Sequence, residues 1–548
     1  MGLVKWCDSR NVCRKGEYMI TLQQVKLPIS HTKEELEKKI LKTLRIKKEE
    51  LLGYEIRKQS LDARKKPELF FVYTIDASVK KEEIVIKKIK EKTVSIINRK
   101  KFEYPAVIEW SKASRPVITG SGPAGLFCAY YLAKAGLAPL VIERGDPVET
   151  RMEKVETFWK EGFLDTESNV QFGEGGAGTF SDGKLNTLVK DAMGRNHEVL
   201  RLFVECGAPK EILYVQKPHL GTDLLVTIVK NLRHKIEELG GEIRFRTKLT
   251  QIWQENGKLK SIIVNGDEEI ATDFLVLAIG HSARDTFEML EREKFLMQAK
   301  SFAVGLRIEH PQSMIDEYQY GTKKHAGKLG AASYKLTHRA EEGRGVYSFC
   351  MCPGGYVVNA SSEEGRLAVN GMSYQDRSAK NANSAMIVSV NPNDFCSQDA
   401  LAGVAFQRQL EEKAYQLGKG KVPVQLFGDF MNHRKSSGFG MIDTCMKGAY
   451  EFADLNELLP EFLSRPMKES ISYFGRIIAG FSREDAVLSG IESRTSSPVR
   501  IVRKEDFQSN VEGVYPCGEG AGYAGGITSA AMDGLKVAEA IVKNTINF

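Results

Sequence analysis

The stretch from Val117 to Gly145 reads VITGSGPAGLFCAYYLAKAGLAPLVIERG, and it decides the expected fold. A helix of small residues is expected over 126–135, and an apolar strand over 138–142 ends at Glu143. A β-branched run precedes three glycines in a G-x-G-x-x-G spacing, namely Gly120, Gly122 and Gly125. The order of strand, glycine turn, helix, strand and acid is the one that a dinucleotide-binding βαβ unit requires.

Each position in this turn has a physical role. Gly120 permits a sharp turn, Gly122 lets a pyrophosphate approach the backbone, and Gly125 allows close packing of helix and strand. Glu143 can accept hydrogen bonds from an adenosine ribose, and the helix N-terminus attracts phosphate. The nucleotide-binding residues predicted here are Gly120, Ser121, Gly122, Pro123, Ala124, Gly125, Glu143 and Arg144. The alternative, a glycine loop that only closes a turn, does not explain the complete βαβ context.

The composition is that of an ordinary globular protein of 548 residues, long enough for three or four domains. The longest apolar runs, such as 274–279, are too short to span a bilayer, and the first residues lack a secretory signal. Nine cysteines without framework spacing fit a reducing compartment. We therefore expect a cytoplasmic protein without a membrane span.

Residues 1–110 are expected to form a ferredoxin-like α+β domain. They carry 26 Lys and Arg against 16 Asp and Glu, whereas the whole chain has a net charge of +7. This surplus is either a solvated lysine-rich face or a surface for an anionic partner such as RNA. Alternating and helical patterns predict, in order, a strand, a helix capped by Thr32, two strands and a helix, over 18–30, 33–46, 54–61, 69–76 and 81–90.

A second glycine-rich stretch, FGEGGAGTFSDGKLN, covers 172–186. It contains a formal G-x-G-x-x-G, but no apolar strand precedes it and no helical pattern follows, so it is not a second dinucleotide turn. It is either a flexible linker or a loop that closes around a ligand. In the second case Asp182 and Lys184 could reach a substrate, and the predicted cofactor contacts are Gly175, Gly176, Gly178 and Ser181.

The following residues are expected to return to the first sheet. A helix over 219–239, capped by Thr222 or Asp223, leads to a strand over 242–246. Two Asn-Gly turns then indicate a three-stranded meander. The run DFLVLAIG, 273–280, reads as a buried parallel strand ending at Gly280, which is a further predicted cofactor contact.

Residues 295–475 have a different character and are expected to form an inserted α+β domain. Short alternating strands over 302–371 are followed by a helix over 398–417. Cys350 and Cys352 are too close for a typical zinc site and are either buried strand cysteines or reactive thiols, so no metal is expected. His433 and Arg434 lie in a polar loop that could face a substrate.

The last informative stretch, 514–540, again takes a short strand through a glycine-rich turn into a long helix. Helix packing alone would explain the alanines of the helix but not five glycines between Gly518 and Gly526. The predicted binding residues of this turn are Gly518, Glu519, Gly520, Gly525, Gly526 and Ile527.

Together these stretches resemble the glutathione-reductase-type FAD-binding superfamily and, within it, a bacterial family of FAD-dependent dehydrogenases. VITGSGPAGL with Glu143 matches the first motif, DFLVLAIG the middle motif, and YPCGEGAGYAGGI the C-terminal motif, with Glu519 where many relatives have aspartate. The resemblance implies an α/β fold of FAD-binding Rossmann type. It also implies FAD with its adenine half at Gly120–Glu143 and its flavin between 172–186 and 518–527.

Two absences shape the expected function. No second strand-anchored G-x-G-x-x-G is present, so NAD(P)H is expected at most as a transient electron donor. No C-x4-C pair lies near residue 160, which argues against a disulfide reductase. The expected domains are 1–110, 111–294 (FAD-binding), 295–475 (substrate or cap) and 476–548 (FAD-binding).

The expected activity is that of an oxidoreductase passing hydride between FAD and an unknown small-molecule substrate. The candidate substrate-binding or catalytic residues are Asp182, Lys184, His433 and Arg434. Two alternatives stay open, an RNA-associated flavoprotein and a non-catalytic FAD-binding redox sensor. The oligomeric state is left open.

Overall fold

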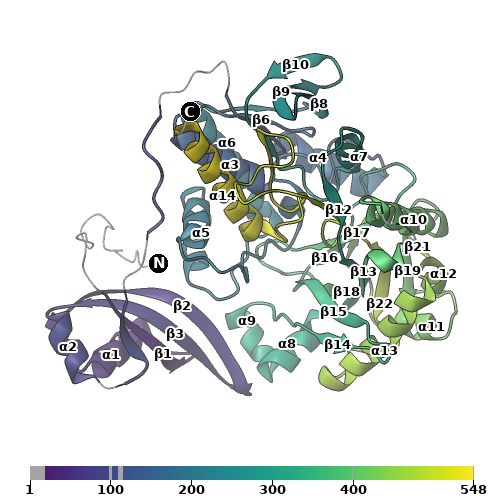
Figure 1. Ribbon diagram of the computed structural model, residues 1–548. Coiled ribbons are helices and arrows are strands. Elements are labelled where there is room, and N and C mark those ends of the chain that lie inside the picture. The colour runs from purple at the N-terminus through teal and green to yellow at the C-terminus, as the bar shows by residue number, and fades with distance from the viewer. Residues whose placement is uncertain are drawn as a thin grey trace. The chain divides into compact units, whose positions relative to one another are not determined.

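The structure is a computed structural model, and it describes residues 19–89, 91–97, 101–108, 115–395, 397 and 399–546. The chain forms two compact units (Figure 1). The first comprises the described residues up to Phe102 together with 192–194 and 211–218, and the second comprises the remaining described residues. The described part contains no helix with both the length and the apolar composition needed to cross a membrane.

The first unit is a four-stranded antiparallel sheet with two helices. Strand order is β2-β3-β1-β4. Thr32 caps the first helix as predicted: its hydroxyl accepts a hydrogen bond from the backbone N–H of Glu35, whose carboxylate accepts from the N–H of Thr32. The elements are β1 (Met19–Pro28), α1 (Lys33–Leu44), β2 (Leu51–Lys65), β3 (Glu68–Val79), α2 (Glu82–Lys88) and β4 (Val94–Ile97).

The hairpin of β2 and β3 is longer than the sequence indicated. The turn was expected at 62–66, but β2 continues to Lys65 and β3 starts at Glu68. Asp62 stays in the strand because it is paired with Lys26, 2.8 Å away, and with Arg64. The charged residues thus form ion pairs within the sheet instead of marking its end. Predicted residues 18, 90, 398 and 111–114 lie outside the described part of the chain.

The second unit contains the predicted βαβ arrangement in a five-stranded parallel sheet. Its order is β24-β11-β5-β6-β7, and Val117 lies beside both Leu140 and Leu275. Helices α3 and α14 lie side by side, and a Cβ on Gly534 would come within 2.2 Å of the Ala124 carbonyl oxygen. The elements are β5 (Val117–Thr119), α3 (Pro123–Lys134), β6 (Leu140–Ile142), α6 (Thr222–Glu238), β7 (Glu242–Arg244), β11 (Leu275–Leu277), β24 (Val514–Pro516) and α14 (Ile527–Ile546).

The elements around this sheet largely follow the sequence pattern. The meander is present, and Asn256 and Asn265 both adopt φ of 53° at its Asn-Gly turns. The predicted cap of α6 is wrong: Gly221 is the N-cap, Thr222 is already helical, and the carboxylate of Asp223 accepts from the backbone N–H of Gln375. The remaining elements are α4 (Val148–Glu161), α5 (Arg195–Glu205), β8 (Leu249–Glu255), β9 (Lys258–Val264), β10 (Glu268–Ala271) and α7 (Arg284–Arg292).

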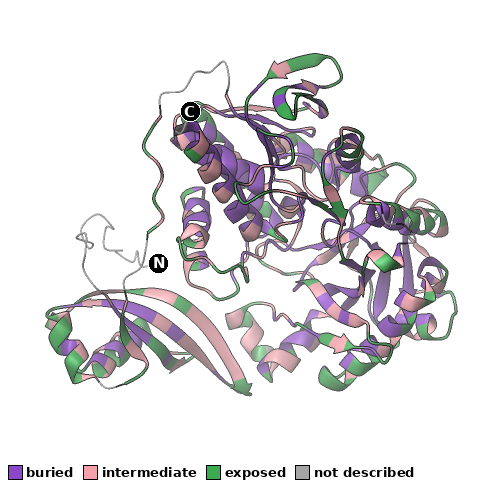
Figure 2. Ribbon diagram, viewed as in Figure 1, coloured by how far each residue is buried: buried purple, intermediate pink, exposed green. Residues whose placement is uncertain are grey.

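The second unit also contains a seven-stranded sheet, in the order β14-β15-β18-β13-β22-β19-β21. Its central strands β13 and β18 are almost entirely buried (Figure 2). The strands of this sheet are β13 (Phe302–Pro311), β14 (Thr337–Arg339), β15 (Gly345–Cys352), β18 (Asn381–Val390), β19 (Val422–Leu426), β21 (Tyr450–Phe452) and β22 (Val487–Glu492).

Smaller elements surround that sheet. β17 and β20 flank β16 in a three-stranded sheet, and β12 pairs with β23. Their bounds are β12 (Met297–Ala299), α8 (Gln312–Tyr320), α9 (Ala326–Leu329), β16 (Tyr356–Asn359), β17 (Val369–Met372), α10 (Ala402–Leu417), α11 (Phe427–Met431), β20 (Met446–Lys447), α12 (Leu455–Leu458), α13 (Glu461–Ile477) and β23 (Val499–Ile501).

Two central strands of the seven-stranded sheet were not predicted. β18 reads NANSAMIVSV, and its polar first half is buried with hydrogen-bond partners: Asn383 accepts from Arg307 Nε at 2.9 Å, and Asn381 donates to Glu309 at 3.1 Å. β22 lies between β13 and β19, so the sheet of the inserted region continues beyond residue 475.

Gly125 gives a sharp test of the packing in the parallel sheet. A Cβ at this position would lie 1.9 Å from the Gly120 carbonyl oxygen, so the Gly125→Ala variant must distort the turn. We expect it to lower the free energy of unfolding by about 3 kcal/mol, measured by urea denaturation. Gly438→Ala is the matched control, because a Cβ there meets no atom within 4 Å. Equal stability of the two variants would contradict this packing.

Candidate functional site

The three glycine-rich turns of the second unit meet at one cavity of about 370 Å³. Its walls come from the β5–α3 turn, the 172–186 loop, the residues after β11 and the β24–α14 turn, and also from β15, β17 and β22. The predicted residues that line it are Gly120, Gly122, Pro123, Ala124, Glu143, Arg144, Gly176, Gly178, Ser181, Asp182, Lys184, Gly280, Glu519, Gly525, Gly526 and Ile527.

Other predicted glycines lie behind the cavity and allow the turns to approach one another. A Cβ on Gly518 would lie 2.7 Å from the Ala124 Cβ, and one on Gly520 would lie 2.4 Å from the Gly280 carbonyl oxygen. The backbone N–H of Gly175 donates to the carbonyl of Ser121 at 2.9 Å. These positions, together with Gly125, shape the site without lining it.

Glu143 holds these turns together. One carboxylate oxygen accepts from the backbone N–H of Ser121 at 2.9 Å and from its hydroxyl at 2.7 Å. The other accepts from the N–H groups of Gly145 at 2.9 Å and Gly173 at 3.1 Å. A carboxylate has about four acceptor positions, and protein donors occupy all of them here. The predicted ribose contact stays a prediction, while the structure gives Glu143 a role in tying loops.

Arg144 forms a flat, charge-balanced wall at the same end of the cavity. It makes two hydrogen bonds to Asp285, at 2.9 and 3.0 Å, and one to Glu167 at 2.7 Å. Its guanidinium lies 4.1 Å from the centre of the Phe172 ring. Burial alone would raise the pKa of Asp285, but Arg144 and Lys248 outweigh it and lower that pKa to about 2.

Asp182 and Lys184 form a cationic cluster with Arg377 on another wall. The buried Asp182 carboxylate lies 2.7 Å from Lys184 Nζ and accepts two hydrogen bonds from Arg377. Although burial favours the neutral acid, the two cations hold the pKa of Asp182 below its usual value. Lys184 also donates to the carbonyl of Met351 and faces the cavity. The cluster therefore carries one net positive charge.

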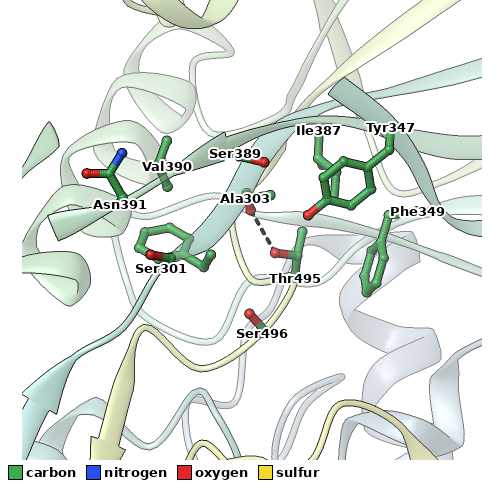
Figure 3. A pocket seen from close by; sticks show the side chains of 11 residues that line it. Ser301, Ala303, Tyr347, Phe349, Ile387, Ser389, Val390, Asn391, Thr495 and Ser496 are labelled. Carbon is green, nitrogen blue, oxygen red and sulfur yellow. Dashed lines mark hydrogen bonds between the residues drawn. The ribbon is translucent and has the colours of Figure 1, made fainter. Parts of the chain in front are cut away.

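The β15 strand brings a thiol into the cavity. Cys350 lines it with φ of 41°, and its carbonyl accepts from Arg307 at 2.6 Å. The side chain of Cys350 is exposed. Cys352 is buried and donates to the Cys350 carbonyl. The neighbouring Phe349 borders both this cavity and a second one on the same sheet (Figure 3).

Two titratable groups meet beside the C-terminal turn. His281 Nδ1 lies 3.9 Å from a Glu519 carboxylate oxygen. Burial, with Arg494 and Arg284 nearby, lowers the pKa of His281 to about 3, so the imidazole is neutral. Burial raises the pKa of Glu519 to about 7, against the opposing effect of Lys300. His281 was missed from the sequence, although it directly follows Gly280 of the predicted strand.

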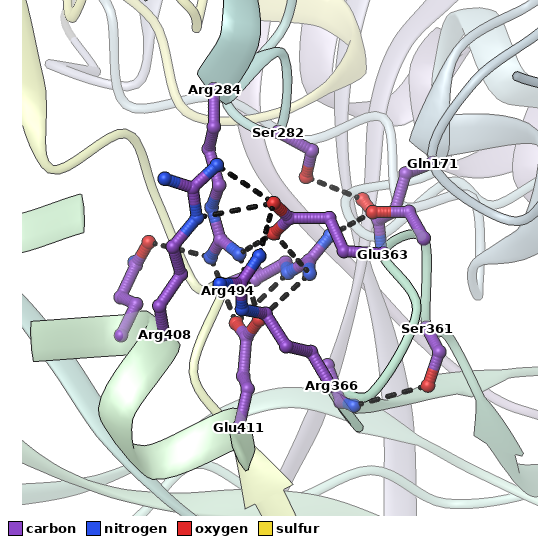
Figure 4. A network of polar contacts seen from close by, with 12 residues as sticks. Gln171, Ser282, Arg284, Ser361, Glu363, Arg366, Arg408, Glu411 and Arg494 are labelled. Atoms are coloured by element: carbon purple, nitrogen blue, oxygen red, sulfur yellow. Dashed lines mark hydrogen bonds and ion pairs between the residues drawn. The ribbon is translucent and has the colours of Figure 1, made fainter. Parts of the chain in front are cut away.

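A buried ion cluster fixes the wall formed by Arg494 (Figure 4). Arg494 and Arg284 both bind the carboxylate of Glu411, each through two hydrogen bonds of 2.7–3.0 Å. Burial would raise the pKa of Glu411, but the two guanidinium groups hold it far below its usual value. Since Arg284 is on α7 and Glu411 on α10, the cluster joins the parallel-sheet region to the inserted region.

The other two candidate residues are not in this cavity. His433 and Arg434 are exposed on the loop after α11. Arg434 binds Asp429 through its Nε at 2.8 Å, and His433 lies 2.9 Å from Lys468 Nζ. The polar sequence of this loop therefore reflects local surface contacts. Within the described ranges, no group of His, Cys, Asp and Glu is arranged to hold a metal ion.

The raised pKa of Glu519 predicts that this residue contributes to stability in a pH-dependent way. Because its pKa rises in the folded state, the acid contributes stability below about pH 4.5 that is lost as the pH rises through about 7. As the pH rises from about 5 to about 8, the free energy of unfolding of Glu519→Gln should therefore increase by on the order of 2 kcal/mol relative to that of the native protein. Urea unfolding of both proteins at the two pH values measures this change. A pH-independent difference would contradict the raised pKa.

Known families match both regions of the second unit. The family described as pyridine nucleotide-disulphide oxidoreductase matches residues 114–289, and the one described as FAD-dependent protein, C-terminal domain-like, matches residues 301–495. A domain of unknown function, DUF8436, matches residues 19–78. The matched ranges contain most of the cavity-lining residues, apart from those of the β24–α14 turn.

Relatives and solved structures extend this comparison. An uncharacterized protein of Clostridium beijerinckii is 50% identical over 96% of this chain and 98% of its own length. The fumarate reductase subunit FrdA of E. coli is 11% identical over 79% of this chain and 71% of its own, with a TM-score of 0.37. The L-proline dehydrogenase of P. horikoshii is 13% identical over 79% of this chain and 95% of its own, with a TM-score of 0.32. The chain belongs to the family of FAD-dependent oxidoreductases that joins a pyridine nucleotide-disulphide oxidoreductase-type domain to the FAD-dependent C-terminal domain, and its cofactor is FAD.

Proposed function

We propose that FAD binds in the 370 Å³ cavity and exchanges hydride with a small-molecule substrate. The observation that supports this most is the meeting of three glycine turns, from distant parts of the chain, around one space. The adenine half would lie along Gly120–Glu143. The flavin would lie between the 172–186 loop and the Gly518–Ile527 turn.

The backbone around the cavity fits such a cofactor. Gly122 has only ordinary contacts around its missing side chain, the nearest atom being Gly176 Cα at 3.8 Å, and Gly525 has none within 4 Å. Both glycines therefore leave open space beside exposed backbone. The first turn of α3 supplies backbone N–H groups without helical partners, which suit a pyrophosphate. Arg144 and Phe172 offer a flat surface to the adenine end.

In this proposal the chemistry of FAD is hydride transfer at the flavin ring, and the protein supplies orientation and charge. Lys184, held by the Asp182 carboxylate and the Met351 carbonyl, places a positive charge where a reduced flavin would be anionic. The carboxyl of Glu519, whose pKa is raised to about 7, can hold a proton near neutral pH, and the neutral imidazole of His281 lies beside it. NAD(P)H would act only as a transient donor. His433 and Arg434 have no part in this proposal.

The finer architecture is also proposed. The order β-α-β-β-α-β in the first unit supports a ferredoxin-like domain over 1–110. The seven-stranded sheet supports a substrate or cap domain inserted between the FAD-binding parts 111–294 and 476–548, with β22 added to the cap. The RNA-associated alternative rests on the charge of residues 1–110 alone, so we favour the oxidoreductase. A redox sensor would differ by lacking rapid turnover with any acceptor.

Gly122→Ala tests the cofactor position. The change adds one methyl group without a steric clash inside the protein but fills the space expected for the pyrophosphate. We expect an unchanged unfolding curve and a loss of FAD affinity of roughly tenfold or more. Flavin fluorescence titration of the apoprotein measures this, with Gly438→Ala as control. Unaltered FAD affinity in the Gly122 variant would exclude this position for the pyrophosphate.

Lys184→Met tests the flavin position. If Lys184 lies beside the flavin, removal of its charge should lower the reduction potential of bound FAD by roughly 30 mV or more, because a reduced anionic flavin loses a favourable interaction. Lys190→Met, a change of the same kind at an exposed position, should leave the potential unchanged. Equilibration with a reference dye measures both. Equal potentials in the two variants would place the flavin elsewhere.

A further inference from the structure

A second cavity, of about 350 Å³, lies on one face of the seven-stranded sheet (Figure 3). The strand register explains its position. Tyr347 on β15 pairs with Ile387 on β18, and Ser389 on β18 pairs with Ala303 on β13, so these side chains share one face. The aromatic rings of β15 thus stand at one side of a floor of smaller residues. The result is a hollow with a flat aromatic wall.

The lining of this hollow is uncharged. Among the described residues that line it there is no Asp, Glu, Lys, Arg or His side chain. Tyr347 and Phe349 supply rings, while the polar groups are hydroxyls and one amide, from Ser301, Ser389, Asn391, Thr495 and Ser496. A charged ligand would lose its hydration here without gaining a counter-charge, whereas a neutral one would not.

The guanidinium of Arg344, which reaches the floor of the hollow, is already paired. Arg344 donates to the carbonyl of Ser389 at 3.0 Å, but its guanidinium also binds Asp394 at 2.6 Å. Burial raises the pKa of Tyr347, so its phenol remains neutral. Thr495 donates its hydroxyl proton to the carbonyl of Ala303 at 2.7 Å, which leaves its oxygen free to accept a hydrogen bond. The hollow therefore offers hydrogen-bond donors and hydrogen-bond acceptors without a net charge.

The hollow adjoins the proposed cofactor cavity. Phe349 and Thr495 line both spaces, so the two meet at these side chains. Cys350, the residue after Phe349, lines only the cofactor cavity. A molecule in the hollow would therefore lie next to the part of the cofactor cavity that β15 and the residues after β22 enclose.

We propose that this hollow is the substrate site, and that it selects an uncharged, flat ring compound bearing carbonyl or hydroxyl groups. The inference rests on the proposed function for the electron transfer, but the binding itself does not need the cofactor. With a quinone as the ring compound, the reduced flavin gives up two electrons and two protons, and the quinone becomes the hydroquinone. The flavin returns to its oxidised form.

The test compares two probes of the same shape, naphthoquinone and naphthoquinone sulfonate. Equilibrium dialysis against the purified full-length protein measures their binding. Ser389→Trp fills the floor of the hollow, and Ser301→Trp covers its rim from an exposed position that tolerates a large side chain. Ser472→Trp, on the exposed face of α13, is the control of the same size change.

We expect the neutral probe to bind at least roughly tenfold more tightly than the sulfonate. Both hollow variants should weaken its binding roughly tenfold or more, while Ser472→Trp leaves it unchanged. After photoreduction of the FAD-loaded protein, naphthoquinone should reoxidise the flavin more slowly in the hollow variants than in the control. Equal binding of the two probes, no binding of either, or full binding to both hollow variants would overturn the inference.

FAD content separates this inference from the function on which it rests. If the protein binds no FAD but the neutral probe still requires Ser389 and Ser301, the hollow is a ligand site and the proposed function fails. If FAD binds and is photoreduced normally but both substitutions leave the binding of the neutral probe unchanged, the proposed function stands and the substrate site is elsewhere.

Discussion

The second unit depends on a single buried carboxylate, that of Glu143. Three loops from separate parts of the fold direct backbone N–H groups toward the same point, and such groups are costly to bury without an acceptor. Glu143 satisfies the N–H groups of Ser121, Gly145 and Gly173 at once. Because the glycines lack side chains, the loops can approach one another closely, and the carboxylate holds them together by accepting hydrogen bonds from their N–H groups. The cavity is the space left in front of that junction.

A second constraint comes from charge buried between the two sheet systems. Arg284, Arg494 and Glu411 are all almost fully buried, and none could remain charged there alone. Two guanidinium groups on one carboxylate leave a positive excess, which Glu363 reduces by pairing with Arg284, although Glu363 also pairs with Arg366 and Arg408. The geometry of the Arg494 wall is therefore set by residues of α7 and α10 that do not touch the cavity themselves.

Local patterns predicted the parallel sheet and its turns because each signal lies within a short stretch. The G-x-G-x-x-G turn, the Asn-Gly turns of the meander and the Thr32 cap all act through neighbouring residues. The strand β18 was missed because Asn381, Asn383 and Ser384 look exposed, and only partners such as Arg307 and Tyr334 on distant segments satisfy them. The cap of α6 failed for the same reason, since Asp223 binds Gln375.

The glycines of the candidate site were predictable from the sequence, whereas its functional side chains were less predictable. Asp182 and Lys184 were expected near a ligand, and they do line the cavity. His281, Cys350 and Arg494 enter it through tertiary contacts that no spacing in the sequence encodes. His433 and Arg434 lie in a polar stretch of the sequence, but the structure places them outside the cavity. Functional side chains are thus easier to predict from sequence when they lie in a glycine-rich turn than when they lie in an inserted domain.

The chain order of the parallel sheet has a consequence for biosynthesis. β5, β6, β7 and β11 are complete once residue 277 has emerged from the ribosome, but β24 pairs with β11 and α14 packs on α3. The turn that closes the cavity, around residues 518–527, is therefore made more than two hundred residues later. During that interval the edge of β11 and one side of α3 are uncovered. The cofactor site of the proposed function is thus complete only after this late segment has been made, although the G-x-G-x-x-G turn is made much earlier.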